Sequence, residues 1–285
     1  MLGLDVLGTG ARVTHGVDHD DEEPQVPRDQ QPASHQVDLL QLDVSLRAQY
    51  GFSDAWALEL ALPIGTVVTD AEFRDAAGAV MPSFASIHHR DETIGGVGDM
   101  QVSARWLALS QAPFSLELRA GVSLPFGEVV EDPYALGDAG KPHRHQFLGT
   151  GTFDPLIGLD ATWSLSDDFD LSLWSSARLP LYAGPKGHRA SRAIAGGASL
   201  GTGVGDVSFQ LGPEARWEST AEWSGRTAEN SGRTDLLVSA GVYWQPAALI
   251  QLFFAAKVPV WLDAVGSQVT QPVIGAIGAR YALDL

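Results

Sequence analysis

The sequence predicts an all-β fold, a single antiparallel transmembrane β-barrel of about 12 strands with short turns on one side and long loops on the other. Three observations predict it. Polar and apolar residues alternate in many stretches, the connections between these stretches alternate in length, and no helical pattern is available to cover the apolar faces. The composition agrees, since 45% of the 285 residues are hydrophobic and 31 are glycine. We therefore treat residues 1–285 as one barrel domain.

Composition and charge exclude several other classes of protein. The chain has no cysteine, which excludes disulfide scaffolds, cysteine-based zinc sites and thiol catalysis. Its net charge of −17 argues against a nucleic-acid partner, because binding a phosphate backbone needs basic surface. The longest uncharged apolar runs, such as 249–256, are far shorter than the roughly 20 residues of a spanning helix.

The alternation is clearest at residues 41–50. Successive side chains of a strand point to opposite faces, so the apolar series from Leu42 to Tyr50 lies on one face and the polar series from Gln41 to Gln49 on the other. The pattern recurs over 100–106, 114–124, 169–181 and 214–223. In order, the predicted strands are 1–14, 36–51, 55–70, 96–109, 114–127, 153–165, 169–183, 202–211, 214–224, 234–245, 249–262 and 270–285.

The connections between these strands alternate in length. The predicted short turns are 51–54, 110–113, 166–168, Gly212-Pro213 and 246–248. The predicted extracellular loops are 15–35, 71–95, 128–152, 184–201 and 225–233, with a shorter connection at 263–269. Short turns on one side and long loops on the other are typical of outer-membrane barrels.

A membrane barrel explains the apolar faces better than a soluble fold. With apolar faces toward lipid and polar faces toward an aqueous lumen, a closed sheet satisfies every backbone group. The alternative is a soluble two-sheet sandwich, in which the loop alternation would be accidental. Aromatic residues near the short turns predict a girdle there: Tyr50, Phe52, Trp56, Trp106, Phe114, Trp163, Phe169 and Trp244.

These features predict the outer membrane of a Gram-negative bacterium as the location. The end of the chain, Tyr281 to Leu285, resembles the C-terminal assembly signal of bacterial outer-membrane proteins, although that signal usually ends in an aromatic residue. The expected partners are therefore outer-membrane lipid and lipopolysaccharide, the barrel-assembly machinery and a small-molecule solute. Residues 1–14 lack the basic start of a signal peptide, which we expect to be absent from this chain.

Short glycine, aspartate and proline motifs carry a family resemblance. Residues 149–155, Gly-Thr-Gly-Thr-Phe-Asp-Pro, resemble the G-S-G-x-x-D-P segment of bacterial outer-membrane barrels of the meta-pathway phenol-degradation or transporter type. Gly96-Val97-Gly98-Asp99 and Val258-Pro259-Val260 with 266–268 fit the same family. The resemblance covers roughly residues 96–285. It implies an outer-membrane channel or uptake protein for small hydrophobic or aromatic compounds.

The histidines suggest a metal site. All eight lie in predicted long loops, and six lie in clusters or beside acidic residues: His88, His89, His143, His145, His15 and His19. Imidazole and carboxylate together suit Cu²⁺, Zn²⁺ or Ni²⁺, so a divalent transition metal is the candidate cofactor. The hypothesis is a metal site at the outer mouth, built from loops 71–95 and 128–152. The alternative is that these are solvated polar loops without a specific ion.

The polar strand faces predict the lining of the lumen. The candidate lumen or selectivity residues are Asp43, Arg47, Glu59, Asp99, Arg105, Glu117, Arg119, Asp160, Asp170, Arg178, Lys257 and Arg280. They could form a charged eyelet that selects solutes, or pair across strands and partly fill a narrow bore.

The functional interpretation is an outer-membrane channel or transporter that passes a small molecule, with hydrophobic or aromatic solutes as the candidate class. One alternative is a surface barrel that captures Cu, Zn or Ni with its His-rich loops. A second is a structural or adhesive barrel. No catalytic motif is convincing, because no Gly-x-Ser-x-Gly segment is present and the paired glycines precede no helix, so we expect no enzyme.

Overall fold

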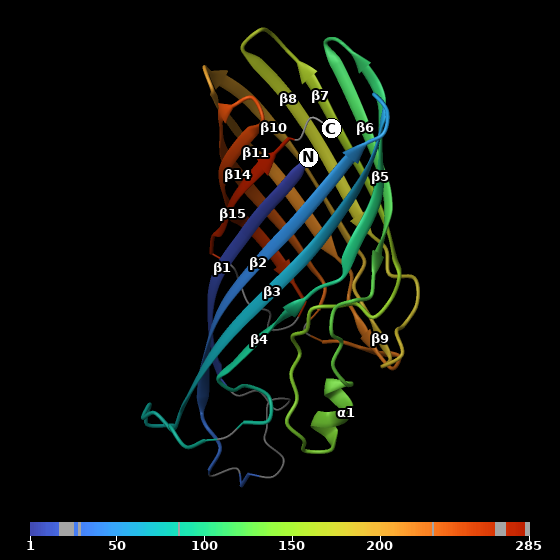
Figure 1. Ribbon diagram of the computed structural model, residues 1–285. Helices are drawn as coiled ribbons and strands as arrows, with labels where there is room; N and C mark the ends of the chain where they lie inside the picture. The colour runs from blue at the N-terminus through green and yellow to red at the C-terminus, as the bar shows by residue number, and fades with distance from the viewer. Residues whose placement is uncertain (17–25, 28–29, 85, 230, 266–271, 283–285) are drawn as a thin grey trace.

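Strands that are apolar on one face and polar on the other pair edge to edge until the sheet closes. The computed structural model describes residues 1–16, 26–27, 30–84, 86–229, 231–265 and 272–282, and there twelve antiparallel strands form a closed barrel (Figure 1). Pairing of β1 with both β16 and β2 brings the two ends of the chain together. The barrel strands are β1 (Leu2–Gly16), β2 (Ser34–Gly51), β3 (Trp56–Arg74), β5 (Met100–Gln111), β6 (Phe114–Leu124), β7 (Asp154–Ser164), β8 (Phe169–Arg178), β10 (Ala193–Val204), β11 (Val207–Glu218), β14 (Arg233–Ala247), β15 (Ile250–Ala264) and β16 (Ile274–Tyr281).

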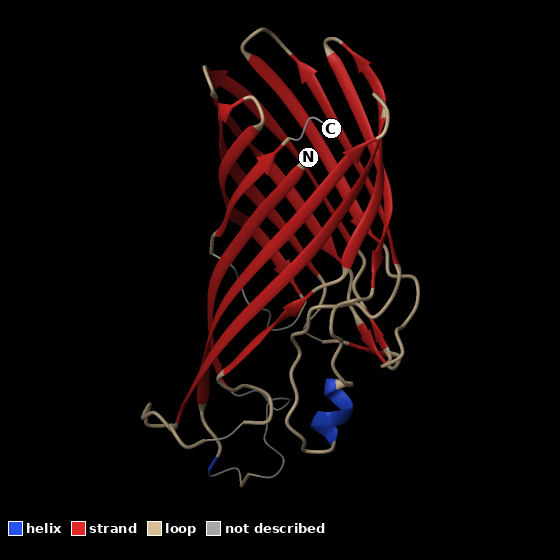
Figure 2. Cartoon of the chain, in the orientation of Figure 1, coloured by secondary structure: helices blue, strands red, loops and turns tan. Residues whose placement is uncertain are grey.

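The remaining elements lie toward the end of the barrel that carries the long loops (Figure 2). β4 (Glu92–Val97) pairs with β3 beyond β5, so β4 and β5 are one strand interrupted at Gly98-Asp99. A small sheet of β9 (His188–Arg189), β12 (Glu222–Trp223) and β13 (Arg226–Thr227) and the short helix α1 (Pro133–Asp138) belong to the loops. No helix in the described residues is long and apolar enough to cross a membrane.

Side-chain exposure is the reverse of that in a soluble protein. On β3, Leu58 and Leu60 are 44% and 40% exposed, whereas Glu59 between them is 6% exposed. Large apolar side chains on other strands, among them Leu42 and Phe254, also face outward. The apolar faces therefore cover the outside of the barrel, and the polar faces form its lumen.

All eight residues of the predicted aromatic girdle are exposed. They lie at strand ends or turns on the short-turn side, where Trp56 and Trp106 stack with ring centroids 5.6 Å apart. Aromatic side chains gathered at one height fit the interface between lipid and water.

Strand length also differs around the barrel. β2 and β3 have 18 and 19 residues, about twice the 9–11 that a strand needs to cross the hydrocarbon. These two strands therefore extend past the apolar band at the long-loop end. In Figure 1, β3 reaches farther toward the long loops than β5 does. Their extra length supports loop 75–91, which carries His88 and His89.

The predicted strands 202–211 and 214–224 are wrong in their boundaries. The turn between β10 and β11 lies at Gly205-Asp206, where Gly205 has a φ of +59° that favours glycine. Gly212-Pro213 lies inside β11, and the pairing with β10 is interrupted there and resumes in the same register. A Cβ on Gly212 would lie 1.8 Å from the carbonyl oxygen of Ala198, so this glycine permits a close approach of two strands.

Several predicted loop boundaries are also wrong, because the strands beside them begin or end at other residues than predicted. Residues 193–201 of the predicted loop 184–201 belong to β10, which leaves 179–192 as the connection after β8. Residues 15–16 and 34–35 belong to β1 and β2, because the hydrogen-bonded ladder continues to the pair Gly16 and Ser34. The loop predicted at 225–233 begins already at residue 219.

Candidate functional site

Adjoining cavities run through the described part of the barrel. The central cavity, of about 610 Å³, takes its wall from β1 and β16 and, on the opposite side of the barrel, from β7 and β8. The loop-end cavity, of about 490 Å³, shares Asp43 and Pro63 with it. The turn-end cavity shares Tyr243 with the central cavity. A fourth cavity, which we call the wall cavity, is lined by residues of β3 and β5–β7 and of β8, β10 and β11, and it shares Arg47 with the central cavity.

The candidate lumen residues on β3, β5 and β6 are joined in one ion-pair network. Arg105 donates to Glu59 at 2.9 Å and to Glu117 at 2.7 Å. Arg119 lies 3.5 Å from the other oxygen of Glu59, and Gln49 accepts a further hydrogen bond from Arg105. These side chains are held along one wall, which supports the filled-bore alternative at this point of the lumen.

Other candidate lumen residues lie around the central cavity: Asp43, Arg47, Asp160, Lys257 and Arg280. Two of them form ion pairs with residues of other strands, since Arg47 lies 3.0 Å from Asp5 and Lys257 lies 2.8 Å from Glu214. Arg280 donates to Gln251 on the next strand at 3.3 Å. Asp170 is exposed near the short turn that follows β7. Arg178 lines both the loop-end and wall cavities.

An aromatic group in the central cavity was missed. Trp174, Tyr243 and Phe253 line it, and the rings of Tyr243 and Phe253 stack at 5.8 Å. The guanidinium of Arg280 lies 5.4 Å from the ring centre of Phe253. The sequence contained one signal for this group, because Trp174 falls on the polar face of the alternating stretch 169–181.

The two glycine-rich motifs meet at Asp99. Its carboxylate accepts hydrogen bonds from the backbone of Gly127 at 2.9 Å and of Thr150 at 2.7 Å, and from the Thr150 hydroxyl at 2.8 Å. Gly127 and Gly149 lie so close that a Cβ on Gly149 would be 2.3 Å from the oxygen of Gly127. Asp99, predicted as a selectivity residue, lines the loop-end cavity, and its buried carboxylate holds both ends of the connection 125–153 at the strand interruption.

Three long connections pack together over the loop end of the barrel, and we call residues 125–153, 179–192 and 219–232 the lid. Its small core contains Ala221, Trp223 and Ala228, against which Phe147 and Tyr134 pack. His188 lies in the same group, with its ring 4.5 Å from Trp223 and 4.7 Å from Phe147. Burial lowers the pKa of His188, and nearby Arg178 adds to the effect.

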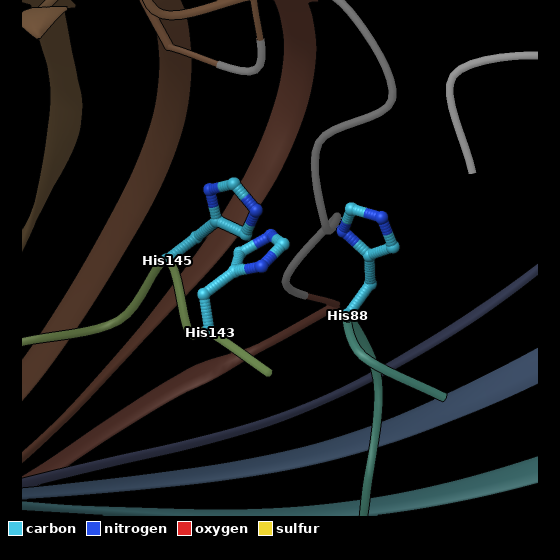
Figure 3. A group of neighbouring side chains, drawn as sticks. All are labelled: His88, His143 and His145. Carbon is cyan, nitrogen blue, oxygen red and sulfur yellow. The ribbon is translucent and has the colours of Figure 1, made fainter. Parts of the chain in front are cut away.

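The structure brings together three of the six candidate metal ligands. One potential ligand atom from each of His88, His143 and His145 lies within 4.8 Å of the others. Figure 3 shows the three side chains as neighbours. Burial and the two neighbouring histidines lower the pKa of His145 to about 4.

The other three candidates lie elsewhere or outside the described part of the chain. His89 packs on His35 at 4.7 Å, and the backbone of His15 pairs with that of His35 in the ladder of β1 and β2. His19 lies outside the described residues. The expectation that every histidine lies in a loop is therefore wrong for His15 and His35, and His188 lies in β9.

Comparison with known proteins rests on structure. No protein-family model and no curated protein sequence matches the chain. An outer membrane channel from Pseudomonas putida F1 is similar with a TM-score of 0.63 and 13% identity, over 98% of this chain and 94% of that one. The NanC porin is similar with a TM-score of 0.50 and 9% identity, over 98% and 100% of the two chains. The fold is thus that of the outer-membrane β-barrels.

Proposed function

We propose that this protein is an outer-membrane channel of a Gram-negative bacterium, with its long loops outside, and that it passes a small molecule with an aromatic ring and polar substituents. The observation that carries the proposal is the central cavity, where Trp174, Tyr243 and Phe253 lie among charged side chains inside the barrel. Its volume of about 610 Å³ is within the range of small-molecule sites.

The composition of the cavity wall supports this class of solute. Aromatic rings attract other rings by offset or edge-to-face contact. Around them, Asp43, Asp160 and Arg280 offer both acceptors and donors for hydroxyl or carboxyl substituents.

The arrangement of the cavities supports passage through the barrel. Wall residues shared between neighbours connect the loop-end cavity to the central cavity and this one to the turn-end cavity. The ion pairs around Glu59 and Arg105 occupy space along one wall and narrow the lumen there, which favours a selective path over a wide pore. The two similar solved structures are described as a channel and a porin, and the resemblance of residues 149–155 to the phenol-degradation barrels favours aromatic solutes.

Single-channel recording in a planar bilayer tests the proposal. We expect discrete conductance steps from the refolded full chain, and a larger reduction of current by phenol than by cyclohexanol, which has the same ring size without aromaticity. Trp174→Ala should weaken the effect of phenol by about 2- to 10-fold, the range that corresponds to a lost aromatic contact of about 0.5–1.5 kcal/mol, whereas Trp174→Phe should retain most of it. Equal effects of the two alcohols would contradict the aromatic class, and a correctly inserted barrel without steps would contradict the channel.

A further inference from the structure

Three histidine rings converge where loop 75–91 meets the connection 125–153. The ring centroids of His88 and His143 are 4.5 Å apart and those of His143 and His145 are 5.1 Å apart. The two histidines of 125–153 approach His88 from one side, and ring nitrogens from all three side chains face the space between them (Figure 3). His88 and His143 are 55 positions apart in the sequence, so only folding of the loops produces this group.

The backbone around His143 is fixed by contacts across the two loops. Its N–H donates to the carbonyl of Ile87 at 3.0 Å, and its own carbonyl accepts from Arg90 at 3.3 Å. On the α1 side, a Cβ on Gly137 would lie 3.0 Å from the His143 ring, so the absence of a side chain there makes room for the imidazole. The site therefore does not depend on loose loops meeting by chance.

Hydrogen bonds also orient the individual groups. Nδ1 of His143 lies 3.0 Å from the carbonyl oxygen of Lys141. A carbonyl can only accept, so Nδ1 is the donor, and in the neutral ring Nε2 then carries the lone pair, which is the arrangement of a metal-binding histidine. The hydroxyl oxygen of Ser86 accepts from the backbone of His88 at 3.0 Å and fixes the turn before it.

The donor set selects the class of ion. Three imidazoles without a carboxylate suit Zn²⁺, Cu²⁺ or Ni²⁺ and do not suit Ca²⁺ or Mg²⁺, which take oxygen ligands. A tetrahedral Zn²⁺ with bonds of about 2.0–2.1 Å holds its nitrogens about 3.4 Å apart. The three ligand atoms lie within 4.8 Å of one another, so a small rotation of the rings would bring them to the Zn²⁺ distances.

We propose that His88, His143 and His145 bind one Zn²⁺ ion, which ties loop 75–91 to the lid and closes the loop-end entrance of the barrel. His145 lines the loop-end cavity as well as belonging to the cluster, so the ion would lie at the border of that cavity. Binding of the ion stands on the geometry alone. The closing of an entrance rests on the proposed channel function.

Zn²⁺ binding is measured on the full chain without an affinity tag, refolded in detergent and freed of metal by a chelator. We expect one site per chain in a titration against a chromophoric chelator, and affinity at least about 10-fold weaker in His88→Asn and His145→Asn. His89→Asn is the matched control, because His89 is the next residue in the same loop and packs on His35. The absence of a site in the parent protein, or equal losses in H89N and H145N, would overturn the proposed binding.

A second measurement tests the clamp separately. In bilayer recordings, Zn²⁺ added on the long-loop side should block the parent protein and H89N, a chelator should restore the current, and H145N should be unaffected. Hydrogen exchange at residues 86–90 and 143–147 gives an independent readout, and Zn²⁺ should slow it in the parent protein and not in H145N. Binding with unchanged exchange and current would overturn the clamp and leave the site. A lack of conductance with Zn²⁺-dependent exchange would instead count against the channel.

Discussion

At the scale of single residues, burial of a titratable side chain couples the lid to pH. His188 packs between Phe147 and Trp223, and its pKa lies below the ordinary 6.5, mainly because burial disfavours the charged form. When the lid opens, the pKa of His188 returns toward 6.5, so His188 binds a proton more readily in the open lid than in the closed lid. The stability of the lid is therefore complete above about pH 6.5 and decreases as the pH falls from there toward the lower pKa of the closed lid.

We expect the hydrogen-exchange protection factors of residues 221–228 to fall between about pH 7 and pH 5, and His188→Phe, which keeps an aromatic ring, to reduce this dependence. His145 contributes in the same direction, since its pKa is lowered to about 4, so H188F should not remove the dependence entirely. Protection that rises on acidification, or that falls equally in H188F, would contradict the role of His188.

At the scale of elements, one carboxylate connects a strand to the lid. Asp99 accepts three hydrogen bonds from Gly127 and Thr150, and hydrogen bonds to charged groups contribute about 1.5–3 kcal/mol each. Asp99→Asn replaces one acceptor oxygen by an N–H donor that faces other donors. We expect the opening free energy of residues 148–152 to fall by about 2–4 kcal/mol, measured by hydrogen exchange.

Thr150→Val is the matched comparison, because it removes the hydroxyl, with its bond to Asp99 and its longer contacts to Thr152, but keeps both backbone bonds to Asp99 and the size of a buried side chain. We expect this variant to lower the opening free energy of residues 148–152 by about 1 kcal/mol. If the two variants opened equally, the backbone bonds to Asp99 would contribute little, and the close packing of Gly127 on Gly149 would hold the lid by itself.

The same elements show why sequence predicts some of this structure and not the rest. Alternation over residues 41–50 reports a local property, the two faces of one strand, and it predicts β2 correctly. A turn is a choice between competing local signals, and Gly212-Pro213 has the composition of a turn but lies in a strand interruption, whereas Gly205-Asp206 makes the turn. The interpretation of the histidines predicted the two loops of the cluster, but which of the rings converge depends on the backbone bond between His143 and Ile87, far apart in the chain.

At the scale of the whole molecule, the lid and the lumen would be separate determinants of passage in the proposed channel. The lid packs over one end of the barrel around Phe147, Tyr134 and Trp223, whereas the aromatic group of the central cavity lies on the barrel strands. Replacing residues 130–146 by a short Gly-Ser linker leaves Gly127, Gly149 and Asp99 in place. The strands themselves are unchanged, so the variant should keep the gel mobility shift on heating that marks a folded barrel.

We expect this variant to conduct at least about twice the current of the parent protein, because the access path at the loop end widens. Its block by phenol should be unchanged, because Trp174, Tyr243 and Phe253 are untouched, and its block by Zn²⁺ should be lost together with His143 and His145. An unchanged conductance in the folded variant would place the narrowest point deeper, at the ion pairs of Glu59. A loss of phenol block would place the aromatic site in the lid, so a single set of current traces distinguishes the three positions along the barrel axis.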